Sequence, residues 1–137
     1  MKTAYLYFSV LAIFLFISCD KQETSQTFTF GIEKSFKING VYQSDDHSVK
    51  FKITDINDSR CPSDVECVWA GKADVSIEIQ SPVTGTIVLS TIDENIYHSI
   101  DTLGNYSFQL LSVSPYPVST ETIDLEDYEI SLKVEEL

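Results

Sequence analysis

Two cysteines six positions apart, Cys61 and Cys67, carry the clearest chemical potential in this sequence. Thiols at this spacing could ligate a metal, form a reactive redox pair or close a structural disulfide. A zinc site needs about four ligands, but the two histidines, His47 and His98, stand in other segments and no second cysteine pair accompanies them. Redox pairs more often have the spacing C-x-x-C in a βαβ context. We therefore predict a structural disulfide, which requires a location outside the reducing cytosol.

The N-terminal residues indicate such a location. Lys2 precedes an apolar run at residues 4–17. As a helix this run would be about 21 Å long, which is too short to cross a bilayer core of about 30 Å. A positive start, a short apolar run and a small residue before the cleavage point are the parts of a secretory signal peptide. We therefore expect residues 1–18 to be one.

The end of this segment, LFISCD, resembles the lipobox of bacterial lipoproteins, with Ser18 before Cys19 and Phe16 where the usual motif has leucine. The resemblance implies cleavage before Cys19, lipidation of its thiol, and anchoring to membrane lipid in the bacterial cell envelope. The outer membrane is the expected membrane, and its periplasmic or surface face stays open. Residues 19–27 would form the lipidated cysteine and a flexible polar tether. Two alternatives are an ordinary signal peptide with an incidental cysteine and an uncleaved anchor helix.

The chain is strongly acidic. Lys2 is the only charged residue of segment 1–18, so its removal leaves 8 basic against 21 acidic residues, a net charge of −13. Such a surface repels the phosphates of nucleic acids and of anionic lipids, so we expect no nucleic-acid partner. The remaining length is sufficient for one domain with a core of its own.

After the tether, the sequence is typical of β-strands. Apolar and polar residues alternate with a period of two, the pattern of half-buried antiparallel strands. The clearest alternations lie at residues 49–56, 73–79 and 128–134, and further β-rich segments lie at residues 28–38, 84–91 and 106–113. A single helical turn is expected near residues 120–127.

Turn signals rich in glycine, proline and asparagine separate these segments. About seven strands in residues 28–137 predict an all-β domain, an antiparallel two-sheet β-sandwich with Ig-like, Greek-key connections. A small β-barrel is the alternative. In either fold the two cysteines lie on the loop that joins the strand at 49–56 to a strand that begins at Trp69.

Four residues are candidate ligand contacts: Trp69, Tyr116, Asp58 and Arg60. Trp69 beside a disulfide typically packs into a sandwich core, and the alternative is an exposed platform for a sugar or peptide. Asp58 and Arg60 are expected to pair across the loop in a structural role. Tyr116, between two prolines, is expected to be a tucked-in turn residue or a ligand contact. Gly71 permits a bulge or a close backbone approach.

The segment DSRCPSDVECVWAG, followed by ADVSIEI and later by LLSVSPYP, resembles an element of uncharacterised small bacterial secreted proteins and envelope lipoproteins. The shared pattern D-S-R-C-P-x4-C-x-W-x-G-x-A falls on residues 58–73, and the resemblance covers about residues 36–137. It implies a β-rich envelope domain and no established activity.

The common hydrolase, nucleotide-binding and metalloprotease motifs are absent from the sequence. Asp55, Asn57 and Asp58 offer oxygen atoms that calcium accepts, and a strand-ending turn is the other interpretation of this segment. We expect no cofactor and no metal. The favoured function is a non-enzymatic envelope module that binds an envelope protein or glycan or serves structurally. The alternative is an accessory enzyme or inhibitor with a site built on loops.

Overall fold

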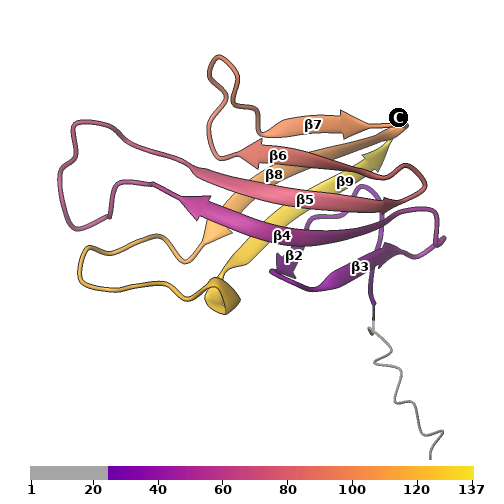
Figure 1. Cartoon of the computed structure of the whole chain (residues 1–137), viewed down its shortest axis with the longest axis horizontal. Helices are drawn as coiled ribbons and strands as arrows, with labels where there is room; N and C mark the ends of the chain where they lie inside the picture. The colour runs from indigo at the N-terminus through magenta and orange to yellow at the C-terminus, as the bar shows by residue number, and fades with distance from the viewer. Residues whose placement is uncertain (1–24) are drawn as a thin grey trace, which may run out of the picture.

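The computed structural model describes residues 25–137, which form two β-sheets packed face to face (Figure 1). The five-stranded sheet has the order β1-β3-β4-β5-β6, and the four-stranded sheet has the order β2-β9-β8-β7. The strands form two open sheets, which confirms the predicted β-sandwich over the barrel alternative. The strand bounds are β1 Gln26–Phe28, β2 Lys34–Lys37, β3 Val41–Ser44, β4 Lys50–Asp58, β5 Ala73–Ser81, β6 Gly85–Ser90, β7 Ile100–Leu103, β8 Tyr106–Ser114 and β9 Glu129–Glu136.

The described chain has nine strands rather than about seven. The additional ones, such as β3 and β7, have four residues each and are too short to show a clear alternation. β1 pairs with β3 in parallel, against the antiparallel expectation. Three hairpin-linked strands, β7 to β9, and β2 beside β9 give the second sheet the order of a Greek key.

The domain boundary lies slightly earlier than predicted. Gln26 and Thr27, assigned to the tether, belong to β1. The predicted signal peptide, Cys19 and the first residues of the tether lie outside the described residues. Within residues 25–137 no helix combines the length and the apolar character that crossing a membrane requires. A short 3₁₀ helix at Leu125–Asp127 confirms the helical turn predicted near residues 120–127.

The hydrophobic core fills the space between the sheets. The predicted inward residues of the three clearest alternations are buried: Val49, Phe51, Ile53, Ala73, Val75, Ile77, Ile79, Tyr128, Ile130, Leu132 and Val134. The ring of Phe51 lies 5.3 Å from that of Phe36 on β2 and 5.6 Å from that of Phe108 on β8, measured between centroids. These aromatic contacts join the two sheets, and each fully buried side chain contributes about 1.5–3 kcal/mol. Among residues 25–137, the buried hydrophobic residues run from Phe28 to Val134 and form one core.

A β-bulge in β4 sets up the candidate site. The register with β5 shifts between Ile53 and Asp55, so the inward face passes to Ile56, which is buried, and then to Asp58. An uninterrupted alternation would have turned Asp58 toward solvent. The bulge therefore places a carboxylate at the end of the core, where β4 leaves the sheet.

Candidate functional site

Three loops gather toward one end of the sandwich, on the left and at the top in Figure 1. They are the β4–β5 loop (residues 59–72), the β6–β7 loop (residues 91–99) and the β8–β9 loop (residues 115–124). Six of the thirteen exposed large hydrophobic residues of the described chain lie on these loops: Val65, Val68, Trp69, Ile96, Tyr97 and Tyr116. Because exposed apolar side chains concentrate at this end of the sandwich, the loop end is the candidate site.

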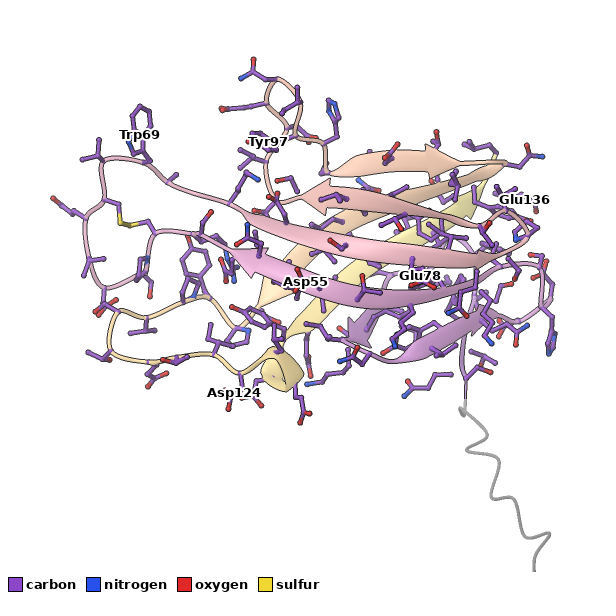
Figure 2. The ribbon with its side chains drawn as sticks, in the orientation of Figure 1. Asp55, Trp69, Glu78, Tyr97, Asp124 and Glu136 are labelled. Carbon is purple, nitrogen blue, oxygen red and sulfur yellow. A yellow bond between two sulfur atoms is a disulfide. The ribbon has the colours of Figure 1, made fainter. Side chains whose placement is uncertain are left out.

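The β4–β5 loop is held in a defined shape. Cys61 and Cys67 form a disulfide with a Cα–Cα distance of 5.9 Å, as predicted and as Figure 2 shows. The backbone N–H of Cys61 donates to the carbonyl of Ala70 at 2.8 Å, and the N–H of Ser59 donates to the carbonyl of Lys72 at 2.8 Å. These bonds extend the β4–β5 hairpin beyond the sheet. By the loop-entropy relation, closing this short ring stabilises the fold by about 2.4 kcal/mol.

Gly71 has the close backbone approach that the sequence predicted. Its φ of +67° lies in the left-handed region, which side chains disfavour. A Cβ atom at this position would lie 1.9 Å from the carbonyl oxygen of Ser59. Glycine therefore allows the two arms of the hairpin to approach each other below the disulfide.

Arg60 connects the two sheets beneath the loops. Its Nε and Nη2 atoms donate to the carboxylate of Asp58 at 2.8 and 2.6 Å. Its guanidinium also donates to the carbonyls of Val113 at 2.7 Å and Pro115 at 2.9 Å. The hydroxyl of Tyr128 donates to Asp58 at 3.0 Å. Both charged side chains are only 7% exposed, so the predicted structural pairing of Asp58 and Arg60 is confirmed.

The pKa values in this cluster reflect that pairing. Burial opposes the charged form of Asp58, but the hydrogen bonds and positive charge of Arg60 outweigh it and lower the pKa of Asp58 below its ordinary 3.8. Burial and the hydrogen bond to Asp58 raise the pKa of Tyr128 above its ordinary 10.0. Asp58 is therefore ionised across the neutral range, and its carboxylate is held by hydrogen bonds from Arg60 and Tyr128.

Hydrogen bonds also fasten the β8–β9 loop to the β4–β5 loop. The N–H of Ser63 donates to the carbonyl of Pro117 at 3.0 Å. The N–H of Ser119 donates to the carboxylate of Asp64 at 2.8 Å, and the hydroxyl of Ser119 donates to the same carboxylate. Those hydrogen bonds from Ser119 lower the pKa of Asp64 below 3.8. The two loops therefore form one connected surface.

The β6–β7 loop is held on the other side. Lys72 forms an ion pair with Asp74, and its ammonium lies 3.7 Å from the centroid of the Tyr97 ring. A cation–π contact such as that between Lys72 and Tyr97 contributes about 0.5–1 kcal/mol at an exposed site. At the base of the loop, the N–H and hydroxyl of Ser99 donate to the carboxylate of Asp93 at 2.6 and 2.7 Å. Tyr97 is thereby positioned opposite the β4–β5 loop.

Two adjoining surface pockets lie at this loop end, and we call the two together the groove. Its first part, the Trp69 pocket, has a volume of about 490 Å³ and is lined by Trp69 and Tyr97. Its second part, the Tyr116 pocket, has a volume of about 400 Å³ and ends at Tyr116. The pockets adjoin through shared lining residues, which are Ala70, Gly71 and Ile92.

The prediction that Trp69 packs into the core is wrong. Trp69 is 82% exposed and stands out from the β4–β5 loop, with Tyr97 on the neighbouring loop (Figure 2). The physical reason is that β5 begins at Ala73 rather than at Trp69, so Trp69 lies beyond the sheets. Tyr116 is also exposed, at 52%, instead of being tucked in. The Arg60 guanidinium lies 4.6 Å from its ring centroid, so one face of the ring is covered and the other is available.

Several groove residues were not predicted from the sequence. Tyr97, Glu94 and Ile92 come from the β6–β7 loop, and Leu111 and Ser112 come from β8. A second bulge, between Leu110 and Ser112, turns Ser112 toward the surface beside Leu111, which already faces outward. The signal that could have indicated the loop is the segment IDENIYHS, in which two large apolar residues interrupt a polar turn.

Most charged side chains that line the groove have partners within the domain. Its two basic side chains, Arg60 and Lys72, are paired with Asp58 and Asp74, whereas Glu94 forms no ion pair within residues 25–137. Because Asp58 is engaged by Arg60, the strand-ending turn is the interpretation that the structure supports for the segment at 55–59. Among the described residues, no three histidine, cysteine or acidic side chains are grouped to hold a metal ion.

Comparisons with models of known protein families, with curated proteins and with solved structures found no match to this chain.

Proposed function

We propose that this chain is a membrane-anchored bacterial lipoprotein whose β-sandwich is a non-enzymatic binding module of the cell envelope. Cys19 carries the lipid and holds the domain at the membrane, and the loop end binds a partner in the envelope. The lipobox-like segment before Cys19 supports the anchor. A disulfide-bonded β4–β5 loop is in keeping with an oxidising compartment.

The observation that carries the proposal is the exposure of Trp69 on a fastened loop. Trp69 is 82% exposed, so much of its apolar surface is in contact with water. This exposure does not stabilise the isolated domain. The disulfide, the hairpin hydrogen bonds and the contacts of Ser63 and Asp64 with the β8–β9 loop limit the conformational entropy lost on binding. Exposed, immobilised aromatic side chains are the usual centres of binding energy in interfaces.

Binding to isolated cell envelopes tests this function. The soluble domain, residues 20–137, is expected to bind envelopes saturably in a sedimentation assay. Trp69→Ala is expected to raise the Kd about 30-fold, because truncating a central aromatic anchor costs about 2 kcal/mol or more. The matched control is Val88→Ala, which truncates an exposed residue of β6 outside the groove and should leave the Kd unchanged. The proposal would be contradicted if both variants lost binding equally, or if neither variant lost binding.

A further inference from the structure

We infer that the groove between Trp69 and Tyr116 binds a neutral carbohydrate chain of the envelope; this inference rests on the proposed function and identifies the class of its ligand. A sugar ring has apolar C–H faces and a rim of hydroxyl groups. It therefore needs an aromatic face to stack on and hydrogen-bonding groups beside that face.

The groove supplies aromatic faces at both of its ends. Trp69 is exposed at the mouth of the first pocket, and Tyr97 stands in the same lining. Tyr116 is half exposed in the second pocket, and its ring is braced from one side by Arg60. The linings of the two pockets share Ala70, Gly71 and Ile92, so a ligand that occupies both is an extended chain that passes over these residues. Tyr and Trp combine a large apolar surface with a polar tip, which suits a ligand that is itself both apolar and polar.

Charge argues for a neutral ligand. Arg60 and Lys72 already have carboxylate partners at close range, so neither offers a free positive charge to an acidic sugar, a phosphate or an acidic peptide. Glu94 adds to the wall a carboxylate that has no ion-pair partner among residues 25–137, and the chain without its predicted signal peptide carries a net charge of −13. An anionic ligand would be repelled on approach.

The hydrogen-bonding groups of the groove match hydroxyl groups. The carboxylate of Glu94 can accept two hydrogen bonds from adjacent hydroxyls. The hydroxyl of Thr91 accepts from the N–H of Ala73 at 3.0 Å and keeps its own hydrogen to donate. Ser112 contributes a second hydroxyl to the Tyr116 pocket. These groups lie beside the aromatic side chains, as a sugar edge requires.

The test uses the same sedimentation assay with envelopes treated in two ways. Periodate cleaves vicinal diols of sugars, and proteinase removes exposed protein. We expect periodate to lower the binding of the soluble domain at least tenfold and proteinase to leave it within twofold. Loss with proteinase but not with periodate would overturn the carbohydrate assignment and leave a protein partner. Retention after both treatments would also overturn it. Absence of binding to untreated envelopes would instead contradict the proposed function itself.

A second measurement identifies the charge class of the ligand. Polysaccharide released from proteinase-treated envelopes is separated by anion exchange into neutral and acidic fractions. Full-length protein, purified in a detergent without a sugar headgroup, is titrated with each fraction while the emission of its single tryptophan is followed. The neutral fraction is expected to shift the emission to shorter wavelength with saturation, in wild type and in Val88→Ala. A Tyr97→Ala variant should need at least tenfold more polysaccharide. A response to the acidic fraction alone would overturn the inference.

Discussion

Replacing Arg60 by alanine is expected to lower the free energy of unfolding by about 3–5 kcal/mol, the cost of leaving one partner of a buried ion pair uncompensated. The side chain of Asp58 is only 7% exposed in the wild-type pair, and the variant would remove the cation that compensates its charge. The carbonyls of Val113 and Pro115 would also lose their donors. Chemical denaturation of the soluble domain, followed by far-ultraviolet circular dichroism, measures the change.

The matched control is Lys133→Ala. Lys133 pairs with Glu135 at 2.6 Å, but its side chain is 33% exposed and that of Glu135 is 48% exposed. Exposed pairs contribute about 0–1 kcal/mol, so this variant should unfold close to wild type. Arg60→Lys should fall between the two, because an ammonium cannot bond to the carboxylate and both carbonyls in the planar geometry of a guanidinium. A loss below about 1 kcal/mol in Arg60→Ala would show that the cluster does not hold the loop end together.

The same pair predicts a pH dependence. The pKa of Asp58 is lowered in the folded protein, so its contribution to stability is fully present above the ordinary pKa of 3.8 and is lost as the pH falls through the folded pKa. In Arg60→Ala the carboxylate of Asp58 has no cation beside it, so its protonation removes the cost of an uncompensated charge. The difference in stability between wild type and Arg60→Ala is therefore expected to shrink as the pH is lowered from 5 to 2. A constant difference over that range would contradict the charge pairing.

Replacing Cys19 by alanine in the full chain is expected to abolish lipid attachment. Wild type should carry acyl chains on its N-terminal residue, Cys19, and should enter the detergent phase in a phase-separation experiment. The physical reason is that each buried CH₂ contributes about 0.8 kcal/mol, so two or more chains hold a domain firmly, whereas one holds it marginally. Intact mass and radiolabelled palmitate incorporation measure the attachment.

A chain in which an ordinary cleavable signal peptide replaces residues 1–19 is the matched control. It should release the domain into the aqueous phase with its fold intact, because it keeps the core that residues 25–137 form, whose buried hydrophobic residues run from Phe28 to Val134. If the wild-type protein starts at another residue, or carries no acyl chain, the anchoring proposal fails. The binding of the soluble domain to envelopes would remain a separate question.

The sequence predicted the core of the fold because its longest strands have one buried face and one face in contact with solvent. The resulting alternation of apolar and polar residues can be recognised within β5 and β9 alone, and within β4 up to the bulge. The parallel pairing of β1 with β3 depends on three residues at each strand and on long-range contacts, which no local pattern encodes. The bulges in β4 and β8 shift the inward face by one position, and nothing in either segment's composition indicates them.

The candidate site was predictable where it depends on neighbours in sequence. Asp58 and Arg60 are two positions apart, and the cysteines close a short ring, so their pairings follow from proximity. The position of Trp69 depends instead on where β5 begins, and the four residues before Ala73 are exposed or intermediate because the second sheet does not reach them. The contribution of Tyr97 depends on the β6–β7 loop approaching Lys72 from a distant part of the chain, which requires the three-dimensional structure.

The central claim is that Trp69 is solvent-exposed in the free protein and is covered by the partner. Because the chain has a single tryptophan, incorporating 5-fluorotryptophan places one ¹⁹F resonance at the site. The free soluble domain is expected to show the solvent isotope shift of an exposed indole. Adding envelopes at concentrations that bind the domain should broaden the resonance and abolish the shift. A resonance without an isotope shift in the free domain, or one that keeps its shift and width when the domain is bound, would contradict the account.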